Sequence, residues 1–365
     1  MLSLPRLRLC AAFVAAGEKS FRAEQLFGWM HQRLVRDLTQ MTNLSTDLRA
    51  RLAFAKPLQT LGLQLSRQSQ IDGSQKLVLD TPHGFPIETV IMPMESGHVT
   101  QCLSSQVGCK MGCDFCATAR IPVRANLTAG EIIEQVAIAC RLGFEQGQSR
   151  GGIAGGVQGP LSARPHNLVF MGMGEPLDNL AALIDALDIL CDKKGFDFSP
   201  RRITVSTSGL AKNIPKLATA HPHVNLAWSL TATTDDVRDR LMPVNKGVPI
   251  QKMVDVLRDL PHSVSRKITF EYALLKGIND ADADAMRLAQ MAVFLRAHVN
   301  AIPFNAWPGS PYVRPERAVI KRFVEVARQH GASISLRESK GQDIGAACGQ
   351  LAGESAQKQK TAEDL

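Results

Sequence analysis

Apolar residues recur at three- and four-residue spacing from residue 21 to residue 54, and polar residues fill the positions between them. Such spacing aligns the apolar side chains along one face of a helix. The repeat is interrupted at Thr42 and Asn43. The pattern therefore predicts two or three amphipathic helices, which we assign to a small helical N-terminal domain over residues 1–72.

Between residues 75 and 92 the pattern changes to two runs that are rich in β-forming residues. These runs flank Pro82, His83 and Gly84, a combination that favours a turn. The arrangement predicts a β-hairpin. We place it in a linking extension over residues 73–100, between the helical domain and the rest of the chain.

From residue 101 to residue 340, short apolar runs alternate with helical stretches. The runs are QCLSSQV, NLVFM, RRITVSTS, VNLAWSL, RKITFEYALL and VNAIPFN, and clear helical patterns cover residues 128–142 and 180–191. This alternation is typical of an α/β domain with a parallel sheet. About six such units are too few for a closed eight-fold barrel, so we expect an incomplete, open barrel. Thr128 and Glu131 form a capping-box pattern at the start of one helix.

Parallel sheets bind ligands beyond the carboxyl ends of their strands. Two segments of this sequence fall at such positions: the cysteine-rich loop at residues 109–116 and the string GMGEP at residues 172–176. The site is therefore expected at that edge of the sheet.

Two segments show no periodicity. Residues 147–166 are rich in glycine, which predicts a mobile surface loop. Residues 353–365 are polar, which predicts a frayed tail at the end of a C-terminal segment over residues 341–365.

The composition favours a folded protein with a polyanionic partner. Of 365 residues 45% are hydrophobic, and 42 Lys and Arg against 34 Asp and Glu give a net charge of +8. Positive charge favours nucleic acid because each neutralised phosphate releases counterions. Arg6 and Arg8 interrupt the apolar start of the chain, and no apolar run approaches the ~20 residues of a membrane helix. We therefore expect a cytoplasmic protein.

The cysteines add candidate chemistry. Cys109, Cys113 and Cys116 follow C-x3-C-x2-C within CKMGCDFC, close enough for three thiolates to bind one iron-sulfur cluster. Without an export signal, clustered cysteines indicate metal binding or catalysis more than disulfides. Three thiolates leave one iron of a four-iron cluster open to a cofactor that carries an amine and a carboxylate. The alternative is a zinc site completed by a fourth Cys or His.

The cysteine loop, with an aromatic residue before its last cysteine, resembles the radical S-adenosylmethionine superfamily. The strings CLSSQVGCKMGCDFCATA, VFMGMGEPLDN, RRITVSTSGL, LKGIND and GQDIGAACGQLAGE resemble the RlmN family, and FRAEQLFGWM and MTNLS resemble its helical N-terminal domain. The resemblance covers about residues 20–355 apart from the glycine-rich segment. It implies a partial (β/α)6 radical-SAM barrel with a small N-terminal helical domain that helps to bind RNA.

The resemblance also implies an activity and its cofactors. The expected reaction is methylation of carbon 2 of an adenosine in 23S ribosomal RNA and, in some members, transfer RNA. The implied cofactors are a [4Fe-4S] cluster on Cys109, Cys113 and Cys116 and S-adenosyl-L-methionine. An electron donor such as flavodoxin or ferredoxin would reduce the cluster.

By the family pattern, a set of residues after the strands would contact S-adenosylmethionine: Gly174, Glu175, Ser206, Ser229, Leu230, Thr231 and Asn305. A glycine permits close backbone approach, a carboxylate accepts from an ammonium, and hydroxyl or amide groups pair with ribose and adenine edges. The chain departs from the family at Thr231, where a histidine is usual.

Three further residues match catalytic positions of the family. Cys348 would carry the methyl group as S-methylcysteine and would then become bonded to the base in a protein–RNA adduct. Cys102 would break this adduct, and Glu88 would accept the proton from carbon 2 of the adenine. Two alternatives remain from the sequence. One is methylation of carbon 8, as in the Cfr resistance enzymes, and the other is a non-catalytic RNA-binding protein with a structural zinc.

Overall fold

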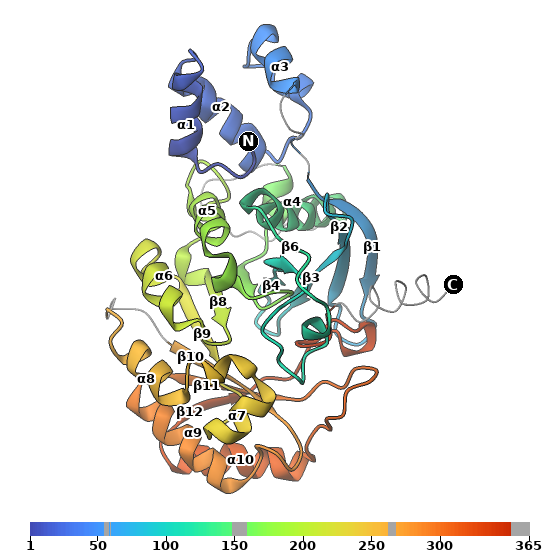
Figure 1. Cartoon of the computed structure of the whole chain (residues 1–365). Coiled ribbons are helices and arrows are strands. Elements are labelled where there is room, and N and C mark those ends of the chain that lie inside the picture. The colour runs from blue at the N-terminus through green and yellow to red at the C-terminus, as the bar shows by residue number, and fades with distance from the viewer. Residues whose placement is uncertain (55–57, 59, 148–158, 262–267, 352–365) are drawn as a thin grey trace.

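The computed structural model describes residues 1–54, 58, 60–147, 159–261 and 268–351. Two N-terminal helices, α1 (Arg6–Ala15) and α2 (Ser20–His31), pack side by side, and α3 (Thr46–Ala53) follows them (Figure 1). The predicted interruption at residues 42–43 is confirmed, because it falls between α2 and α3.

The helical part of the chain ends earlier than the expected residue 72. Strand β1 (Gly62–Gln68) lies inside that range and pairs with β2 (Gln75–Asp80), so it belongs to the main sheet. The sequence of β1, GLQLSRQ, is half polar and buries little of its surface, which is why periodicity alone did not identify it.

Ion pairs hold the N-terminal helices against the barrel. Arg36, which follows α2, binds the buried carboxylate of Glu134 on α4 (Ala129–Glu145) with an N–O distance of 2.6 Å. Arg6 of α1 binds Asp192 at 2.8 Å, directly after α5 (Leu180–Cys191). The two parts of the chain therefore meet through charge as well as through apolar packing.

The predicted hairpin is present. Strands β2 and β3 (Ile87–Pro93) are antiparallel, and Thr81 closes their turn by donating from Oγ1 to the carbonyl of Phe85. β3 then pairs antiparallel with β4 (Val99–Cys102). The hairpin and β1 thus extend the main sheet at one end.

Ten strands of the described chain form one sheet, in the order β1-β2-β3-β4-β7-β8-β9-β10-β11-β12. The strands from β4 onward run parallel to one another. The later ones are β7 (Asn167–Phe170), β8 (Ile203–Thr207), β9 (Asn225–Ser229), β10 (Ile268–Leu274), β11 (His298–Pro303) and β12 (Ser333–Leu336). Because β1 and β12 end the order without pairing, the barrel is open.

Helices return the chain from each parallel strand to the next. After α4 and α5 they are α6 (Ile214–Ala220), α7 (Asp235–Leu241), α8 (Ile250–Arg258), α9 (Asp282–Phe294) and α10 (Arg317–Gln329). They flank the strands in Figure 1. Six β/α units therefore precede the final strand, which confirms the expected partial (β/α)6 barrel. None of the helices in the described ranges is long and apolar enough to cross a membrane.

Two expectations fall wholly or mostly outside the described residues. Of the glycine-rich segment, residues 148–158 are not described, and Pro160–Ala163 forms a short 3-10 helix. The predicted tail at residues 353–365 is not described at all.

The capping box at α4 is confirmed and supports a first prediction. Oγ1 of Thr128 accepts from the backbone N–H of Glu131 at 3.2 Å, and the Glu131 carboxylate accepts from the Thr128 N–H at 2.7 Å. Thr128→Ala is expected to lower the free energy of unfolding by about 1 kcal/mol, measured by urea denaturation of anaerobically purified protein. Thr234 caps α7 without a side-chain hydrogen bond, so Thr234→Ala is the matched control. Equal losses in the two variants would contradict the assigned role.

Candidate active site at the carboxyl ends of the strands

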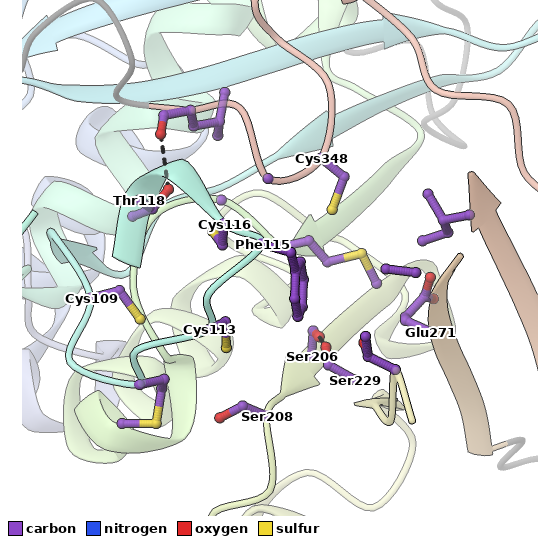
Figure 2. A pocket seen from close by; sticks show the side chains of 18 of the residues that line it. Cys109, Cys113, Phe115, Cys116, Thr118, Ser206, Ser208, Ser229, Glu271 and Cys348 are labelled. Carbon is purple, nitrogen blue, oxygen red and sulfur yellow. Dashed lines mark hydrogen bonds between the residues drawn. The ribbon is translucent and has the colours of Figure 1, made fainter. Parts of the chain in front are cut away.

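One cavity gathers most of the residues predicted to hold a cofactor. It lies beyond the carboxyl ends of the parallel strands and is lined by Cys109, Cys113, Cys116, Gly174, Glu175, Ser206, Ser229, Thr231, Asn305 and Cys348. Figure 2 shows the cysteine loop on one side of this space and Ser206, Ser208 and Ser229 on the other. Residues far apart in the sequence thus converge on one site.

A small second sheet holds the cysteine loop in shape. Strands β5 (Gln106–Val107) and β6 (Ala125–Asn126) pair antiparallel at its base. Within the loop, the N–H of Cys109 donates to the carbonyl of Ile121 at 3.1 Å, and the N–H of Cys116 donates to the carbonyl of Cys113 at 3.0 Å. The backbone therefore fixes where the three thiols project.

Burial disfavours the deprotonated form of these three thiols unless a positive charge lies beside them. It raises the pKa of Cys109 to about 12 and also raises the pKa of Cys113 and of Cys116. For Cys113 the other two thiols add to the effect. A cationic metal centre reverses this balance, because it binds the deprotonated sulfur. The donor set therefore fits a positively charged iron-sulfur cluster.

A mononuclear metal fits less well. The part of the chain that the structure describes contains no group of three His, Cys, Asp or Glu side chains arranged to hold one metal ion. Zinc needs its ligands at a single point. Three thiols that each bind a different iron of one cluster do not have this requirement.

Glu175 is buried at the edge of the cavity, beside a tight turn. Gly174 has φ +92°, and a Cβ there would collide with Gln106, so only glycine suits this position. One oxygen of the Glu175 carboxylate accepts from both the N–H and the hydroxyl of Ser208, at 2.8 and 2.9 Å. Burial raises the pKa of Glu175, and these hydrogen bonds oppose the rise. Glu175 is held rigidly where it could accept from an ammonium.

Asn305 offers an acceptor to a ligand. Its Nδ2 donates to Oγ of Ser339 at 2.8 Å and to the carbonyl of Cys348 at 3.2 Å. Its Oδ1 is buried and has no hydrogen-bond partner among the described residues. A buried acceptor of this kind is costly unless a ligand pairs with it.

Thr231 lines the cavity with a strained backbone. Its φ is +56°, which is unusual for a β-branched residue. Asn279 holds the turn by donating from its side chain to the Thr231 carbonyl at 2.5 Å. Leu230 does not line the cavity, since its side chain is buried in the core and its N–H donates to the carbonyl of Glu271.

A second cavity adjoins the first, and Cys348 lines both. Cys102, at the end of β4, lines the second cavity with Glu271 and Arg337. Burial, with the Cys348 thiol beside it, raises the pKa of Cys102 to about 12, while Arg337 opposes the rise. Desolvation by the surrounding protein raises the pKa of Cys348 to about 11, and the positive charge of Arg337 opposes this rise as well. The two predicted catalytic thiols therefore share one electrostatic environment.

Known proteins resemble this chain over nearly its whole length. Residues 1–55 match the family described as ribosomal RNA large subunit methyltransferase N-terminal domain. The crystal structure of a radical SAM methyltransferase from Sphaerobacter thermophilus is 40% identical, with a TM-score of 0.87, over 97% of this chain and 99% of that one. The dual-specificity RNA methyltransferase RlmN of Anaeromyxobacter sp. (strain Fw109-5) is 45% identical over 96% of this chain and 90% of its own. The chain belongs to the RlmN family.

A second member of the RlmN family shows the same extent of similarity. The dual-specificity RNA methyltransferase RlmN of Jannaschia sp. (strain CCS1) is 42% identical over 100% of this chain and 92% of its own length. The family's N-terminal domain corresponds here to α1, α2 and α3.

In this RlmN family member, Glu88 lies outside both cavities. It is 1% exposed on β3, and its carboxylate is 3.9 Å from Nζ of Lys76 on β2. The register pairs Val90 with Cys102, and Glu88 stands two residues before Val90, so Glu88 lies on the same face of the sheet as Cys102. Its role as proton acceptor stays a prediction.

Other site residues escaped the sequence analysis. Arg238 is fully buried and donates to the carbonyls of Ser208, Ser229 and Leu230, which ties the ends of β8 and β9 together. An arginine on a short helix gives no local signal of such a role. Cys140, for which the sequence gave no role, is buried on α4 in this RlmN family member.

The cysteine loop supplies a second prediction. A Cβ at Gly108, where φ is +81°, would overlap the carbonyl oxygens of Ile121 and Pro122. Gly108→Ala is therefore expected to displace Cys109 and remove most of the bound iron. Gly97 has φ +78° and open space around it, so Gly97→Ala is the matched control and should cost about 1 kcal/mol of stability with full iron content. Iron and sulfide analysis after anaerobic reconstitution measures the difference, and full iron in Gly108→Ala would refute the prediction.

Proposed function

We propose that this chain is a radical S-adenosylmethionine RNA methyltransferase that methylates carbon 2 of an adenosine in 23S ribosomal RNA and in transfer RNA. Its RlmN relatives carry the name dual-specificity RNA methyltransferase, which supports two RNA substrates. The observation that carries the proposal is the position of Cys348, which lines both the cavity of the three cysteines and the cavity of Cys102.

The first cavity suits the cofactors. Cys109, Cys113 and Cys116 would hold the [4Fe-4S] cluster, and Glu175 and Asn305 would hold S-adenosylmethionine, with Gly174, Ser206, Ser229 and Thr231 completing the pocket. When bound, these groups supply the methyl group for Cys348 and, after one-electron reduction, the radical that activates it. An external donor such as flavodoxin or ferredoxin would supply the electron.

The second cavity suits an RNA base and its phosphates. Four cationic side chains line it: Arg201, Arg202, Arg337 and Lys340. Asn225 and Asn300 also line it. Their side-chain nitrogens donate to the carbonyls of Arg201 and Ile203 and to Glu271, so their side-chain oxygens are the groups that can accept from a base edge. Phosphate contacts orient RNA, and amides at the base edge distinguish one base from another. An adenosine held here would lie in the cavity that Cys348 and Cys102 both line.

The residues would then act in sequence. The S-methyl group of Cys348, after losing one hydrogen atom, would form a bond from its carbon to carbon 2, which leaves the base joined to the protein. Loss of one electron from this adduct to the redox centre that supplied the first one, and transfer of the proton on carbon 2 to Glu88, would restore the aromatic ring. The sulfur of Cys102 would then attack that of Cys348, the carbon–sulfur bond would break, and its electron pair would take up a proton to complete the methyl group. The products are the methylated base and a Cys102–Cys348 disulfide, which a thiol reductant must reopen before the next turnover.

Loss of the carrier is the first test. Cys348→Ala is expected to abolish methylation completely and to form no covalent RNA complex, while its iron content stays normal. Mass spectrometry of nucleosides from treated 23S and transfer RNA measures the product and identifies the methylated carbon. Cys191→Ala, at a half-buried cysteine that lines neither of these two cavities, is the matched control and should retain activity. Methylated RNA from Cys348→Ala would contradict methyl transfer through Cys348.

Loss of the resolving thiol should stop the reaction later. Cys102→Ala keeps the carrier, so it is expected to add to the base and then to stall as a stable protein–RNA adduct. Denaturing gel electrophoresis with labelled RNA detects the adduct, and digestion followed by mass spectrometry places it on Cys348. Full turnover without an adduct would show that Cys102 does not resolve the bridge.

A further inference from the structure

Glu271 is a buried acidic residue for which the proposed reaction has no task. It lies on β10 and is 7% exposed. Its Oε1 accepts from Nδ2 of Asn300 at 2.9 Å, but its Oε2 is buried without a hydrogen-bond partner among the described residues. Nη1 of Arg337 lies 3.6 Å from Oε2, which is too far for a hydrogen bond. Because a buried acceptor without a donor is costly, a ligand that donates to Oε2 would be stabilised there.

Glu271 stands in a row of polar residues that crosses three parallel strands. The register pairs it with Ser229 on β9 and with Asn300 on β11. Residues paired in this way project from the same face of the sheet. Ser229 lines the first cavity, Asn300 lines the second, and Glu271 lines both (Figure 2 shows Ser229 and Glu271 at the first). The row therefore leads from the first cavity into the second, with Glu271 where they meet.

The junction of the two cavities offers few other polar contacts. The described residues that line both cavities are Met171, Glu271, Ile302, Cys348 and Leu351. Among these five, only Glu271 has a side-chain oxygen. Apolar groups can pack against the faces of an aromatic ring, whereas a few placed polar groups fix its orientation. An aromatic base that reaches Cys348 would therefore be oriented at this junction mainly by the Glu271 carboxyl group.

Adenine carries a donor that suits this position. Its exocyclic amine is attached to carbon 6, and carbons 6 and 2 are both bonded to nitrogen 1, so a base that turns carbon 2 toward Cys348 brings the amine to the same junction. The amine has two hydrogens to donate. Oε2 of Glu271 can accept one, and Asn300, whose nitrogen already donates to Glu271, offers an oxygen for the other. Two acceptors would disfavour the oxygen that guanine has in place of the amine.

We propose that Glu271 determines the base specificity of the reaction by accepting a hydrogen bond from the exocyclic amine of the target adenosine. This inference rests on the proposed function, which places that adenosine in the second cavity. Contacts to the base edge carry specificity, whereas contacts to phosphates orient the RNA without distinguishing its bases. The same hydrogen bond would hold carbon 2 toward Cys348, so it contributes to positioning as well as to selection.

The test uses the full-length, cluster-loaded enzyme and two RNAs that differ at the target position. One contains adenosine, and the other contains purine riboside, which lacks the amine but keeps the hydrogen on carbon 2. The unmodified enzyme is expected to prefer adenosine by roughly 10- to 100-fold in kcat/KM, measured by mass spectrometry of the nucleosides. Glu271→Gln places an N–H donor at Oε2, so it should lose this factor on adenosine and change little on purine riboside. Glu271→Ala should lose the preference too.

A buried carboxylate elsewhere provides the matched control. Glu134 on α4 pairs with Arg36 and lines neither of the two cavities. Glu134→Gln should change kcat/KM equally on the two RNAs and so keep the preference for adenosine. Glu271→Gln should keep its iron content and its Cys348 methylation in the absence of RNA, which shows that the fold and the first cavity are intact. A loss of preference in Glu134→Gln would attribute the effect to general loosening and overturn the proposal.

Two further outcomes separate this proposal from the proposed function. If Glu271 instead bound S-adenosylmethionine, Glu271→Gln would weaken cofactor binding without RNA and would slow both RNAs by the same factor, since the amine and the side chain would then act independently. That result, or equal methylation of both RNAs by the unmodified enzyme, would overturn the role of Glu271 and leave the proposed function intact. Failure of the unmodified enzyme to methylate carbon 2 in either RNA would instead contradict the proposed function.

Discussion

The concentration of acidic groups in one buried cavity is the constraint on which the site depends. Cys109, Cys113, Cys116 and Glu175 meet there, and burial raises the pKa of each. Arg238 approaches this group, but its hydrogen bonds go to backbone carbonyls and to Asn245. The protein alone therefore leaves the site short of positive charge, which a cationic cluster and a sulfonium cofactor can supply.

The parallel sheet makes this concentration possible. Each β/α unit delivers the end of a strand to the same edge, so short side chains such as Ser206 and Ser229 meet with their hydroxyl oxygens 3.3 Å apart. Arg238 then holds two of these ends in register, and the small sheet of β5 and β6 holds the cysteine loop above them. Strands carry Ser206, Ser229 and Glu271, and loops that hydrogen bonds hold in place carry most of the other polar groups that face the cavity.

Local patterns predicted much of this architecture. Helical periodicity, the hairpin signal and the Thr128 capping box each depend on residues within a few positions of one another, and all three appear in the structure. The C-x3-C-x2-C spacing belongs to the same class, since its three cysteines share one loop. Strand β1 was missed because its sequence is largely polar and its pairing with β2, more than its own pattern, defines it.

Long-range contacts explain what the sequence did not reveal. The contact of Lys76 with Gly345 and the bonds of Arg238 to two strand ends join residues that no local spacing relates. Family resemblance placed Leu230 at the cofactor, yet its side chain faces the core. Resemblance also named Glu88, but only the fold shows that this carboxylate is enclosed beside an ammonium.

The proposed function places different demands on the two adjoining cavities, and Cys348 lines both of them. A chamber for a reactive radical must stay small and dry, whereas a chamber for folded RNA must admit a polymer many times its size. Because five residues, Met171, Glu271, Ile302, Cys348 and Leu351, line both chambers, the boundary between them is thin. Under the proposed function, the sulfur of Cys348 in that boundary would take up a one-carbon group on the side of the three cysteines and release it on the side of Cys102. The RNA would then never have to enter the cavity in which the radical is made.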